Sequence, residues 1–206
     1  MPLFITFEGG EGCGKSTQTR ALHLKLEKLA IPSILIREPG GTALGERVRH
    51  ILKKSTQINI SALTELILFN ASRSQLVGEV ILPNLKAGKI VICDRFADST
   101  LAYQSFGRGL DLDIVRDINR IGSQGLKPDL TFLLDISPEI GLSRKPQNAN
   151  DRFEKEKLAF HRKVRQGFLD VAAKDSQRWV VIDSTLPRQQ IAAMIWEKVS
   201  NKLKES

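Results

Sequence analysis

Residues 9–16 read Gly-Gly-Glu-Gly-Cys-Gly-Lys-Ser and carry the strongest structural signal in the chain. They fit the pattern G-x-x-x-x-G-K-[ST], a glycine-rich loop that wraps nucleotide phosphates. The apolar run 3–8 before the loop predicts a short buried strand, and residues 17–30 after it have the leucine spacing of an amphipathic helix. A strand, a glycine loop and a helix in that order are the context that the motif requires.

The motif gives most of its residues a chemical role. Its glycines let backbone N–H groups converge on phosphate oxygens, and the helix N-terminus adds the positive end of its dipole. We expect Lys15 to reach the β- and γ-phosphates and Ser16 to ligate Mg²⁺. The expected ATP-binding residues are Gly9, Gly10, Glu11, Gly12, Cys13, Gly14, Lys15, Ser16 and Thr17.

The composition limits the classes of protein to consider. A chain of 206 residues, 41% hydrophobic and 26% charged, suits one globular domain, which we expect to span 1–206. It has no apolar run of about 18 residues, so we expect no membrane partner. The two cysteines predict no disulfide framework, which favours a cytoplasmic location. The three histidines do not cluster, so we expect surface positions and no protein-bound zinc.

The net charge of +8 raises the question of nucleic-acid binding. The sequence shows no helix-turn-helix, zinc-finger or RNP signature, and the basic residues are spread along the chain. Small polyanionic substrates and solvated helix faces account for the excess, because net charge alone does not define a specific partner. We therefore expect no nucleic-acid partner.

Apolar strand-like runs alternate with helical patterns along the chain. The candidate strands are 3–8, 33–38, 90–94, 130–135 and 179–183. Several are continuously apolar, as expected for strands buried on both faces of a parallel sheet. The sequence thus predicts an α/β fold, with a five-stranded parallel sheet flanked by helices in three layers. Residues 144–152 show no periodicity, and we expect a short lid there. The apolar spacing after it predicts a helix with Phe153, Phe160, Val164, Phe168 and Val171 near one face.

The pattern over 61–87 predicts a long helix that ends near Gly88. One face of it carries Leu66, Phe69, Arg73, Leu76 and Val80. Arg73 interrupts an otherwise apolar stripe. Because an unpaired buried charge is costly, Arg73 must be paired or must bind a ligand.

A phosphate loop alone does not separate kinases from switches, motors or pumps. The guanine-binding motif Asn-Lys-x-Asp of GTPases is absent from the proper region. Arginines stand at several expected ligand-facing positions: Arg37, Arg49, Arg73, Arg95 and Arg108. Bidentate arginine suits phosphate, so we expect an acceptor that already carries one. Such an acceptor needs positioning and charge neutralisation more than a general base.

Five segments carry a resemblance to a known family. They read Phe-Glu-Gly-Gly-Glu-Gly-Cys-Gly-Lys-Ser-Thr at 7–17, Arg-Glu-Pro-Gly-Gly-Thr at 37–42, Phe-Asn-Ala-Ser-Arg at 69–73, Asp-Arg-Phe-Ala-Asp-Ser-Thr-Leu-Ala-Tyr-Gln at 94–104 and Pro-Asp-Leu at 128–130. In this order and spacing they resemble the thymidylate kinase family of the bacterial type. The resemblance implies a P-loop NTPase fold, Mg²⁺-dependent transfer of a phosphoryl group from ATP to dTMP, and a homodimer.

The resemblance also implies where dTMP binds. Phe69 is similar to the residue that stacks on thymine, and Arg73 to the donor for its O4 atom. Tyr103 resembles the residue that crowds the sugar 2′ position, and Glu11 the carboxylate that receives the 3′-hydroxyl. The implied dTMP-binding residues are Glu11, Arg37, Arg49, Phe69, Arg73, Arg95, Thr100, Tyr103 and Gln104.

The same resemblance implies the catalytic set. Arg95 is similar to the arginine that bridges the two phosphates, and Asp94 is expected near Mg²⁺ with Ser16. Some relatives carry a basic residue where this chain has Gly12, so positive charge for the transition state must come from elsewhere, and the lid supplies candidates. The implied catalytic residues are Lys15, Arg95, Arg144 and Arg152, with Arg152 preferred in the lid and Lys145 as a further candidate.

Two alternatives stay open on the residues alone. Another P-loop kinase is possible, with UMP or a deoxynucleoside as acceptor; a sugar hydroxyl would need a base, for which Glu38 is placed. A non-catalytic nucleotide-dependent switch is the second alternative, and the set Lys15, Ser16, Asp94 and Arg95 argues against it.

Overall fold

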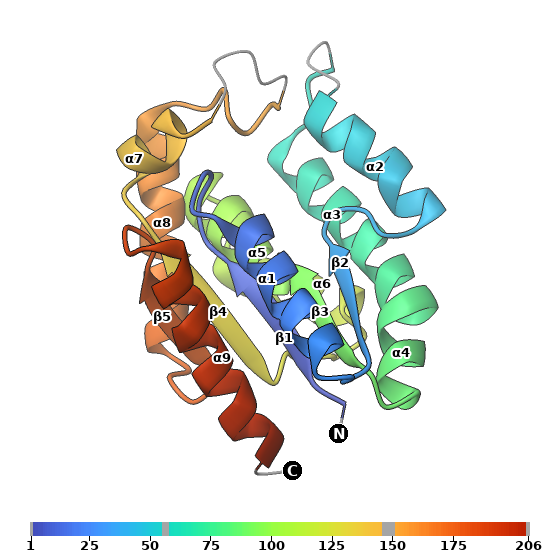
Figure 1. Ribbon diagram of the computed structural model, residues 1–206. Coiled ribbons are helices and arrows are strands. Elements are labelled where there is room, and N and C mark those ends of the chain that lie inside the picture. Colours follow the sequence, from blue (N-terminus) through green and yellow to red (C-terminus); the bar gives the residue numbers. More distant parts are fainter. Residues whose placement is uncertain (1, 55–57, 146–150, 205–206) are drawn as a thin grey trace.

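Five parallel strands form the centre of the computed structural model, in the order β2-β3-β1-β4-β5 (Figure 1). The structure describes residues 2–54, 58–145 and 151–204. The strands are β1 (Phe4–Glu8), β2 (Ser33–Arg37), β3 (Ile90–Asp94), β4 (Leu130–Asp135) and β5 (Trp179–Asp183). The predicted parallel sheet is confirmed, and its bounds differ from the prediction only at residues 3 and 38.

Helices connect the strands and cover both faces of the sheet. They are α1 (Lys15–Lys28), α2 (Ala43–Lys54), α3 (Ala62–Leu76), α4 (Leu82–Lys86), α5 (Ala97–Thr100), α6 (Leu112–Gly122), α7 (Pro138–Ser143), α8 (Leu158–Ala173) and α9 (Arg188–Lys204), with π-helical segments η1 (Val77–Ile81) and η2 (Leu101–Gly107). In the described ranges no helix is long and apolar enough to cross a membrane.

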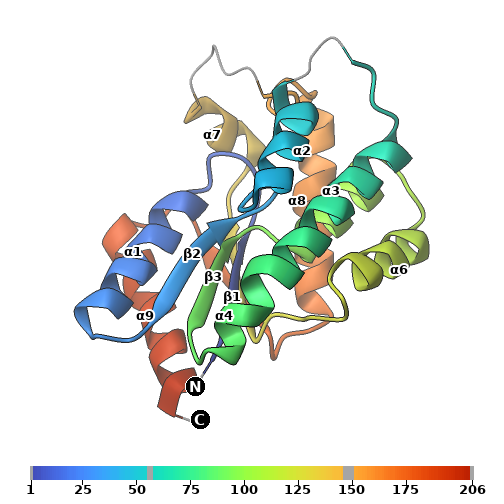
Figure 2. The ribbon, with the colours of Figure 1, turned by 90° about the vertical axis from the view of Figure 1, so that its right-hand side faces the viewer.

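Alternate residues of the central strands β1 and β3 are buried under different helices. In β1, Ile5 and Phe7 belong to the core cluster beneath α1 and α9, whereas Phe4 belongs to the cluster that contains residues of α3 and η1. Figure 2, turned by 90°, shows these helices on the two sides of the sheet. Burial on both faces explains why the strands read as continuous apolar runs.

The helix predicted over 61–87 is continuous but not uniform. Ser61 caps it by accepting a hydrogen bond from the Thr64 N–H at 3.2 Å. The helix widens into the π-helical segment η1 before Pro83, which lies in the first turn of α4. Proline lacks an N–H donor and its ring crowds the preceding turn, so a local π-bulge there has a direct cause.

Two expectations about the region after the lid are wrong. Phe153 precedes α8 and does not share a helical face with Phe160, because the chain turns before the helix begins at Leu158. His161 is buried on α8, and burial lowers its pKa. His50 is exposed as expected, and His23 is partly buried beside Ser33. Residues 146–150 of the predicted lid lie outside the described residues.

The strand register brings the loops after three strands together. Asp94 at the end of β3 pairs with Phe7 of β1 and with Arg37 of β2. The residues that follow these strands therefore meet at one edge of the sheet, at its upper end in Figure 1. Ligands bind at this edge in open parallel sheets.

Candidate active site

The phosphate loop closes around the side chain of its own lysine. Gly14, at the N-cap of α1, has a left-handed backbone with φ of 93°, which glycine adopts without steric cost. Lys15 Nζ donates to the Gly9 and Gly10 carbonyl oxygens at 3.0 and 2.7 Å. The ammonium group thus lies against the loop, whose backbone N–H groups would face the phosphate oxygens.

Ser16 and Asp94 form the polar pair expected near a metal ion. Ser16 Oγ donates to Asp94 Oδ2 at 2.6 Å. A hydroxyl and one carboxylate fit Mg²⁺, which takes a few protein oxygens and completes its octahedron with water and substrate phosphates. Within the described residues no cluster of three or more His, Cys, Asp or Glu side chains is suited to hold a metal. One hydroxyl and one carboxylate suit a Mg²⁺ ion that takes its other ligands from water and substrate phosphates.

A large polar cavity lies beside the loop, and we call it the donor cavity. Its volume is about 800 Å³. It is lined by the loop and by Arg37, Arg49, Lys53, Asp94, Arg95, Arg144 and Lys145, among others. Positive side chains predominate on its walls, as a polyphosphate ligand requires.

Gly12 lies where the loop meets α7. Its φ is 67°, and a Cβ atom there would lie 1.9 Å from the Gly141 carbonyl oxygen. The contacting atom belongs to the backbone of α7, which cannot shift as easily as a flexible side chain. The packing therefore excludes any residue larger than glycine at position 12 in this arrangement. The close packing of α7 against the loop therefore leaves no room for a basic side chain after Glu11.

Arg95 joins the donor cavity to a second, smaller one. Its backbone is in the left-handed region with φ of 74°, an uncommon conformation for a residue with a Cβ atom. Its guanidinium donates to Gly9 O at 2.9 Å and to Glu11 Oε1 at 2.7 Å, and it lies 5.1 Å from the centre of the Tyr103 ring. Arg95 lines both cavities.

Glu11 is held as an anion by the cations around it. Burial favours the neutral acid, but Arg95, Lys15 and Lys53 outweigh it and hold the pKa of Glu11 well below its usual range. Burial raises the pKa of Tyr103 well above its usual range, against the opposing charge of Arg95. The phenol keeps its proton and donates to Glu11 Oε1 at 3.0 Å. Glu11 is thus a charged acceptor between the two cavities.

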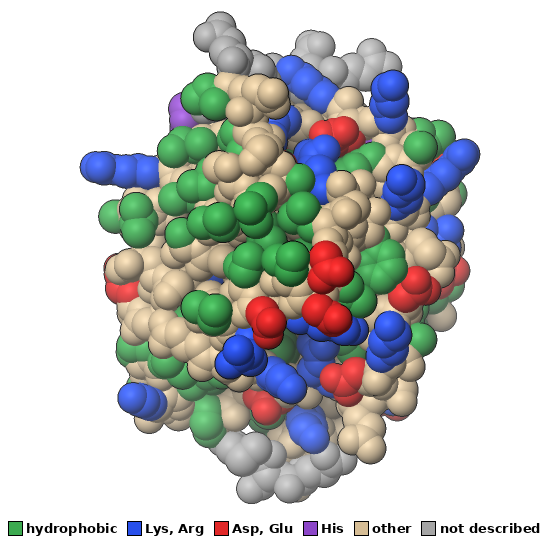
Figure 3. Space-filling view, turned by 180° about the vertical axis from the view of Figure 1, so that it is seen from behind, with side chains coloured by type: hydrophobic (Ala, Val, Ile, Leu, Met, Phe, Trp, Pro, Cys, Tyr) green, Lys and Arg blue, Asp and Glu red, His purple; other side chains and the backbone are tan. Residues whose placement is uncertain are grey.

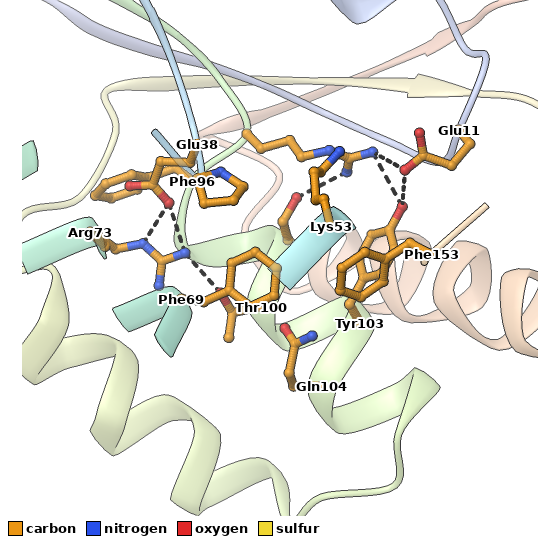
Figure 4. Close-up of a pocket in the computed structure, with 13 residues that line it drawn as sticks. Glu11, Glu38, Lys53, Phe69, Arg73, Phe96, Thr100, Tyr103, Gln104 and Phe153 are labelled. Atoms are coloured by element: carbon orange, nitrogen blue, oxygen red, sulfur yellow. Dashed lines mark hydrogen bonds and ion pairs between the residues drawn. The ribbon is translucent and has the colours of Figure 1, made fainter. Parts of the chain in front are cut away.

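The second cavity is a narrow slot between aromatic rings, shown in Figure 4. We call it the acceptor slot; its volume is about 30 Å³. Phe69 of α3 and Phe153 lie on its sides with ring centres 5.8 Å apart. Its other lining residues are Glu11, Glu38, Pro39, Lys53, Arg73, Arg95, Phe96, Ser99, Thr100, Tyr103 and Gln104. Apolar rings with a few polar groups around them suit a planar heterocycle. The present volume is close to that of one water molecule, so a base would enter only if Phe153 moved away from Phe69.

Arg73 is buried and fully engaged with protein atoms. Only 1% of it is exposed. Its guanidinium pairs with Glu38 at 2.9 Å and donates to Asn70 and Asn119 at 2.9 Å each and to Thr100 at 2.8 Å. Burial raises the pKa of Glu38 although Arg73 opposes the shift. Glu38 is therefore tied to an arginine and is poorly placed to act as a free base.

Three other predicted arginines, Arg37, Arg49 and Arg144, line the donor cavity. Arg37 pairs with Glu46 at 3.2 Å, and Arg49 donates to Pro39 O at 2.9 Å. Arg144 lies at the end of α7 and donates to Gly12 O at 3.4 Å.

Arg152 is not brought to the phosphate loop. Its guanidinium pairs with the carboxylate of Glu65 and donates to Leu52 O at 3.2 Å. Lys145 lies nearer to the reacting centre, 3.7 Å from Glu11 Oε2 and 2.8 Å from Glu154. The catalytic role expected for Arg152 stays a prediction, and it would need the side chain to leave Glu65.

Three residues of the site were not identified from the sequence. Phe153 resembled a helix-face residue, although the preceding Asp151-Arg152 matched the family pattern. Lys53 follows Leu52 near the end of α2 and gave no signal; it pairs with Asp151 at 2.6 Å. Glu65 stands in the first turn of α3, where a solvated acidic residue is common, yet it is completely buried.

The sheet order, the loop after β1 and a second substrate slot beside an arginine define a P-loop kinase that phosphorylates a nucleotide. Comparison with known proteins identifies the family of P-loop kinases to which the chain belongs. A family model described as thymidylate kinase matches residues 7–195.

Individual relatives agree with the family model. A thymidylate kinase of Dehalococcoides mccartyi (strain CBDB1) is 52% identical over 200 residues, covering 97% of this chain and 96% of that protein. One from Deinococcus radiodurans is 48% identical over 201 residues, with 97% of each covered. The crystal structure of thymidylate kinase from Ehrlichia chaffeensis superposes with a TM-score of 0.80 at 33% identity, over 96% of this chain and 98% of that one. The chain belongs to the thymidylate kinase family, the kinases that phosphorylate dTMP to dTDP.

Proposed function

We propose that ATP binds in the donor cavity, that dTMP binds in the acceptor slot, and that the γ-phosphoryl group passes between them beside Arg95. One observation carries this assignment. Arg95 lines both cavities and contacts Gly9 of the phosphate loop and Glu11 at the mouth of the slot. A guanidinium in that position is within reach of a donor and an acceptor phosphate together.

On the donor side, the ATP phosphates lie along the N–H groups of the loop and the first turn of α1. Lys15 exchanges its loop carbonyls for β- and γ-phosphate oxygens. Ser16 and Asp94 would hold Mg²⁺, which would supply positive charge to those phosphates. The remaining loop residues contribute mainly backbone, because their task is to follow the shape of the triphosphate.

On the acceptor side, thymine stacks against Phe69 and its polar edge faces Thr100 and Gln104. Glu11 accepts a hydrogen bond from the sugar 3′-hydroxyl, and the Tyr103 ring fills the space near the 2′ position. The acceptor phosphate lies toward the positive wall of the donor cavity, near Arg37 and Arg49.

The reaction needs no strong base. The acceptor phosphate oxygen is already anionic near neutral pH, because its second pKa is about 6. It attacks the γ-phosphorus, the bond to the β-phosphate oxygen breaks, and ADP leaves with dTDP formed. Lys15 and Arg95 stabilise the charge on the transferred group. Arg144, Arg152 and Lys145 belong to the expected lid at 144–152, whose closure would exclude water.

We also propose that residues 1–206 form one kinase domain that works as a homodimer. The surface that supports a dimer lies on α3 and α6, which pack together. Leu63, Ile67, Ile114 and Ile121 are each at least 48% exposed there. Figure 3 shows hydrophobic side chains gathered in the middle of the face opposite to that of Figure 1, and patches of this kind mark interaction surfaces. Light scattering would show a dimer that Ile121→Asp converts to a monomer; a monomeric parent would contradict the proposal.

Two free, buried cysteines are compatible with a cytoplasmic location, which we propose.

The function is tested by ADP release with ATP and Mg²⁺, offering dTMP, dUMP, UMP, AMP and thymidine separately. Selective turnover of dTMP over UMP and AMP supports the assignment. Turnover of thymidine would give Glu38 the role of base and make the chain a nucleoside kinase. Tight ATP binding with no turnover of any acceptor would favour the nucleotide-dependent switch.

A further inference from the structure

A buried carboxylate behind the acceptor slot gathers side chains from three parts of the chain. Glu65 of α3 has no exposed surface. Its oxygens accept hydrogen bonds from Gln104 Nε2 at 2.8 Å, from Arg108 Nε at 3.1 Å and from Arg152. Such a carboxylate is expensive to bury, and its donors offset that cost. Glu65 does not line the slot, so it has no direct contact with a ligand there.

The contact with Glu65 determines which way the Gln104 amide faces. An ionised carboxylate only accepts hydrogen bonds, so it requires the NH₂ end of the amide and repels the oxygen end. Gln104 lines the acceptor slot, where Figure 4 shows its amide beside Phe69 and Phe153. Among the described residues, none donates to Gln104 Oε1. The amide therefore offers an acceptor to whatever occupies the slot.

The neighbouring polar group has the opposite character. Thr100 Oγ accepts a hydrogen bond from Arg73 Nη2 at 2.8 Å, which leaves the hydroxyl proton available for donation. Thr100 and Gln104 are four residues apart on one helical face, and both line the slot. The slot thus presents a hydroxyl that can donate beside an amide oxygen that can only accept, and the contact with Glu65 orients that amide.

This pattern distinguishes pyrimidine bases by chemistry. Thymine and uracil carry the O4 acceptor next to the N3–H donor. Cytosine carries an N4 amino donor next to an N3 acceptor, which is the inverse. A base of the first kind satisfies Thr100 and Gln104 together, whereas the N3 acceptor of cytosine would face the Gln104 oxygen and be repelled in a buried site.

We propose that Glu65 is a positioning residue that selects 4-oxo pyrimidine nucleotides by fixing the amide of Gln104 with its oxygen toward the base. The proposal rests on the proposed binding of dTMP in this slot. Glu65 acts through Gln104, and its two arginine partners carry no base discrimination. Loss of the arginine contacts would change kcat/KM for every acceptor by the same factor. That factor would cancel in the ratio of kcat/KM for two acceptors.

The test compares kcat/KM for dTMP and dCMP in Glu65→Gln. Glutamine keeps the shape of the Glu65 side chain but offers both a donor and an acceptor. The Gln104 amide can then rotate by about 180° and exchange its oxygen and NH₂ positions. We expect the ratio of dTMP to dCMP to fall by about tenfold or more, because hydrogen-bonding sites otherwise reject mismatched analogues strongly. A Glu65→Gln enzyme that turns over both acceptors more slowly with an unchanged ratio would overturn the proposal.

Glu156→Gln is the matched control. Glu156 accepts from the same Arg108 at 2.6 Å but has no contact with Gln104. We expect its dTMP to dCMP ratio to stay within about twofold of the parent, since the base-reading pair is untouched. An equal fall in the ratio in Glu156→Gln would place the effect in the arginine network and would contradict the role of Glu65.

A second variant covers the case in which Glu65→Gln does not fold. Gln104→Met leaves Glu65 and both arginines in place and removes the acceptor. We expect the same tenfold fall in the ratio, and Glu65→Gln added to it should lower the ratio no further. An unchanged ratio in Gln104→Met would overturn the proposal without any Glu65 variant. A parent enzyme that ignores dTMP would instead refute the proposed function itself.

Discussion

The two halves of the site are built in different ways. The donor half is centred on one unbroken stretch, residues 9–17, which lies beside a cavity of about 800 Å³ that side chains from other segments also line. The acceptor half is a slot of about 30 Å³, assembled from side chains that lie far apart in the sequence. Backbone and one lysine dominate the first, and buried paired side chains dominate the second. Phosphate binding is thus a local property of the sequence, whereas base recognition depends on the whole fold.

If the two halves are independent, a substitution in the phosphate loop should abolish phosphoryl transfer and leave dTMP binding in the acceptor slot unchanged. We expect Lys15→Met to lower kcat by about a thousandfold or more, because its charge acts on the transferred group. ADP release with saturating dTMP measures this. Lys28→Met, on the exposed face of α1, is the control and should keep kcat within about twofold. A loss below tenfold in Lys15→Met would show that the loop lysine is not part of catalysis.

The acceptor half should depend on its buried charges for stability as well as for binding. Arg73→Met leaves Glu38, Asn70 and Asn119 without their shared donor, and we expect a loss of about 3–5 kcal/mol in the free energy of unfolding. Urea unfolding measures it.

Arg116→Met is the matched control for this prediction. Arg116 pairs with Asp113 at the surface of α6, so the variant should change the same quantity by less than about 0.5 kcal/mol. Equal effects of the two variants would mean that the Arg73 network contributes nothing special.

In the donor half, the stability of the fold should depend on close backbone packing more than on paired side chains. Gly12→Ala places a methyl group against the Gly141 carbonyl oxygen and strains a left-handed backbone, so we expect a loss of about 1–3 kcal/mol in unfolding free energy. Gly10→Ala meets no atom within 4 Å, and its stability should change by less than about 0.5 kcal/mol. If thermal unfolding ranks the two variants in the reverse order, the close packing of α7 on the loop is refuted.

The last prediction is a pH dependence at Glu8, the buried final residue of β1. Its carboxylate accepts from the Phe96 N–H at 2.7 Å and from Ser99 Oγ at 2.5 Å. Burial, with Asp98 nearby, raises the pKa of Glu8 from 4.5 to about 8. The folded state therefore binds more protons than the unfolded state between these values, and stability falls as pH rises through that window.

Glu8→Gln removes this titration. Relative to the variant, the parent should lose stability between pH 5 and pH 8, with a slope of order 1 kcal/mol per pH unit at most. Urea unfolding at several pH values measures the difference, with the exposed Glu79→Gln as control. Parallel pH profiles for Glu8→Gln and the parent would show that Glu8 does not titrate in this range.

The same contrast explains what sequence reasoning found and missed. The phosphate loop, the sheet and the buried state of Arg73 follow from contiguous motifs and periodicity. The partners of Arg73 do not, because Glu38, Thr100 and Asn119 come from separate segments. Glu65 was missed because an acidic residue in the first turn of a helix usually faces solvent. Phe153 was missed because its spacing continued the apolar pattern of α8 into the turn before it.

The most direct measurement is calorimetric titration of dTMP into Lys15→Met without ATP. Separate halves predict a Kd within about threefold of the parent value, a difference of about 0.6 kcal/mol, while phosphoryl transfer is lost. Loss of dTMP binding together with transfer would contradict the account and would show that the loop lysine and the acceptor slot form a single binding unit.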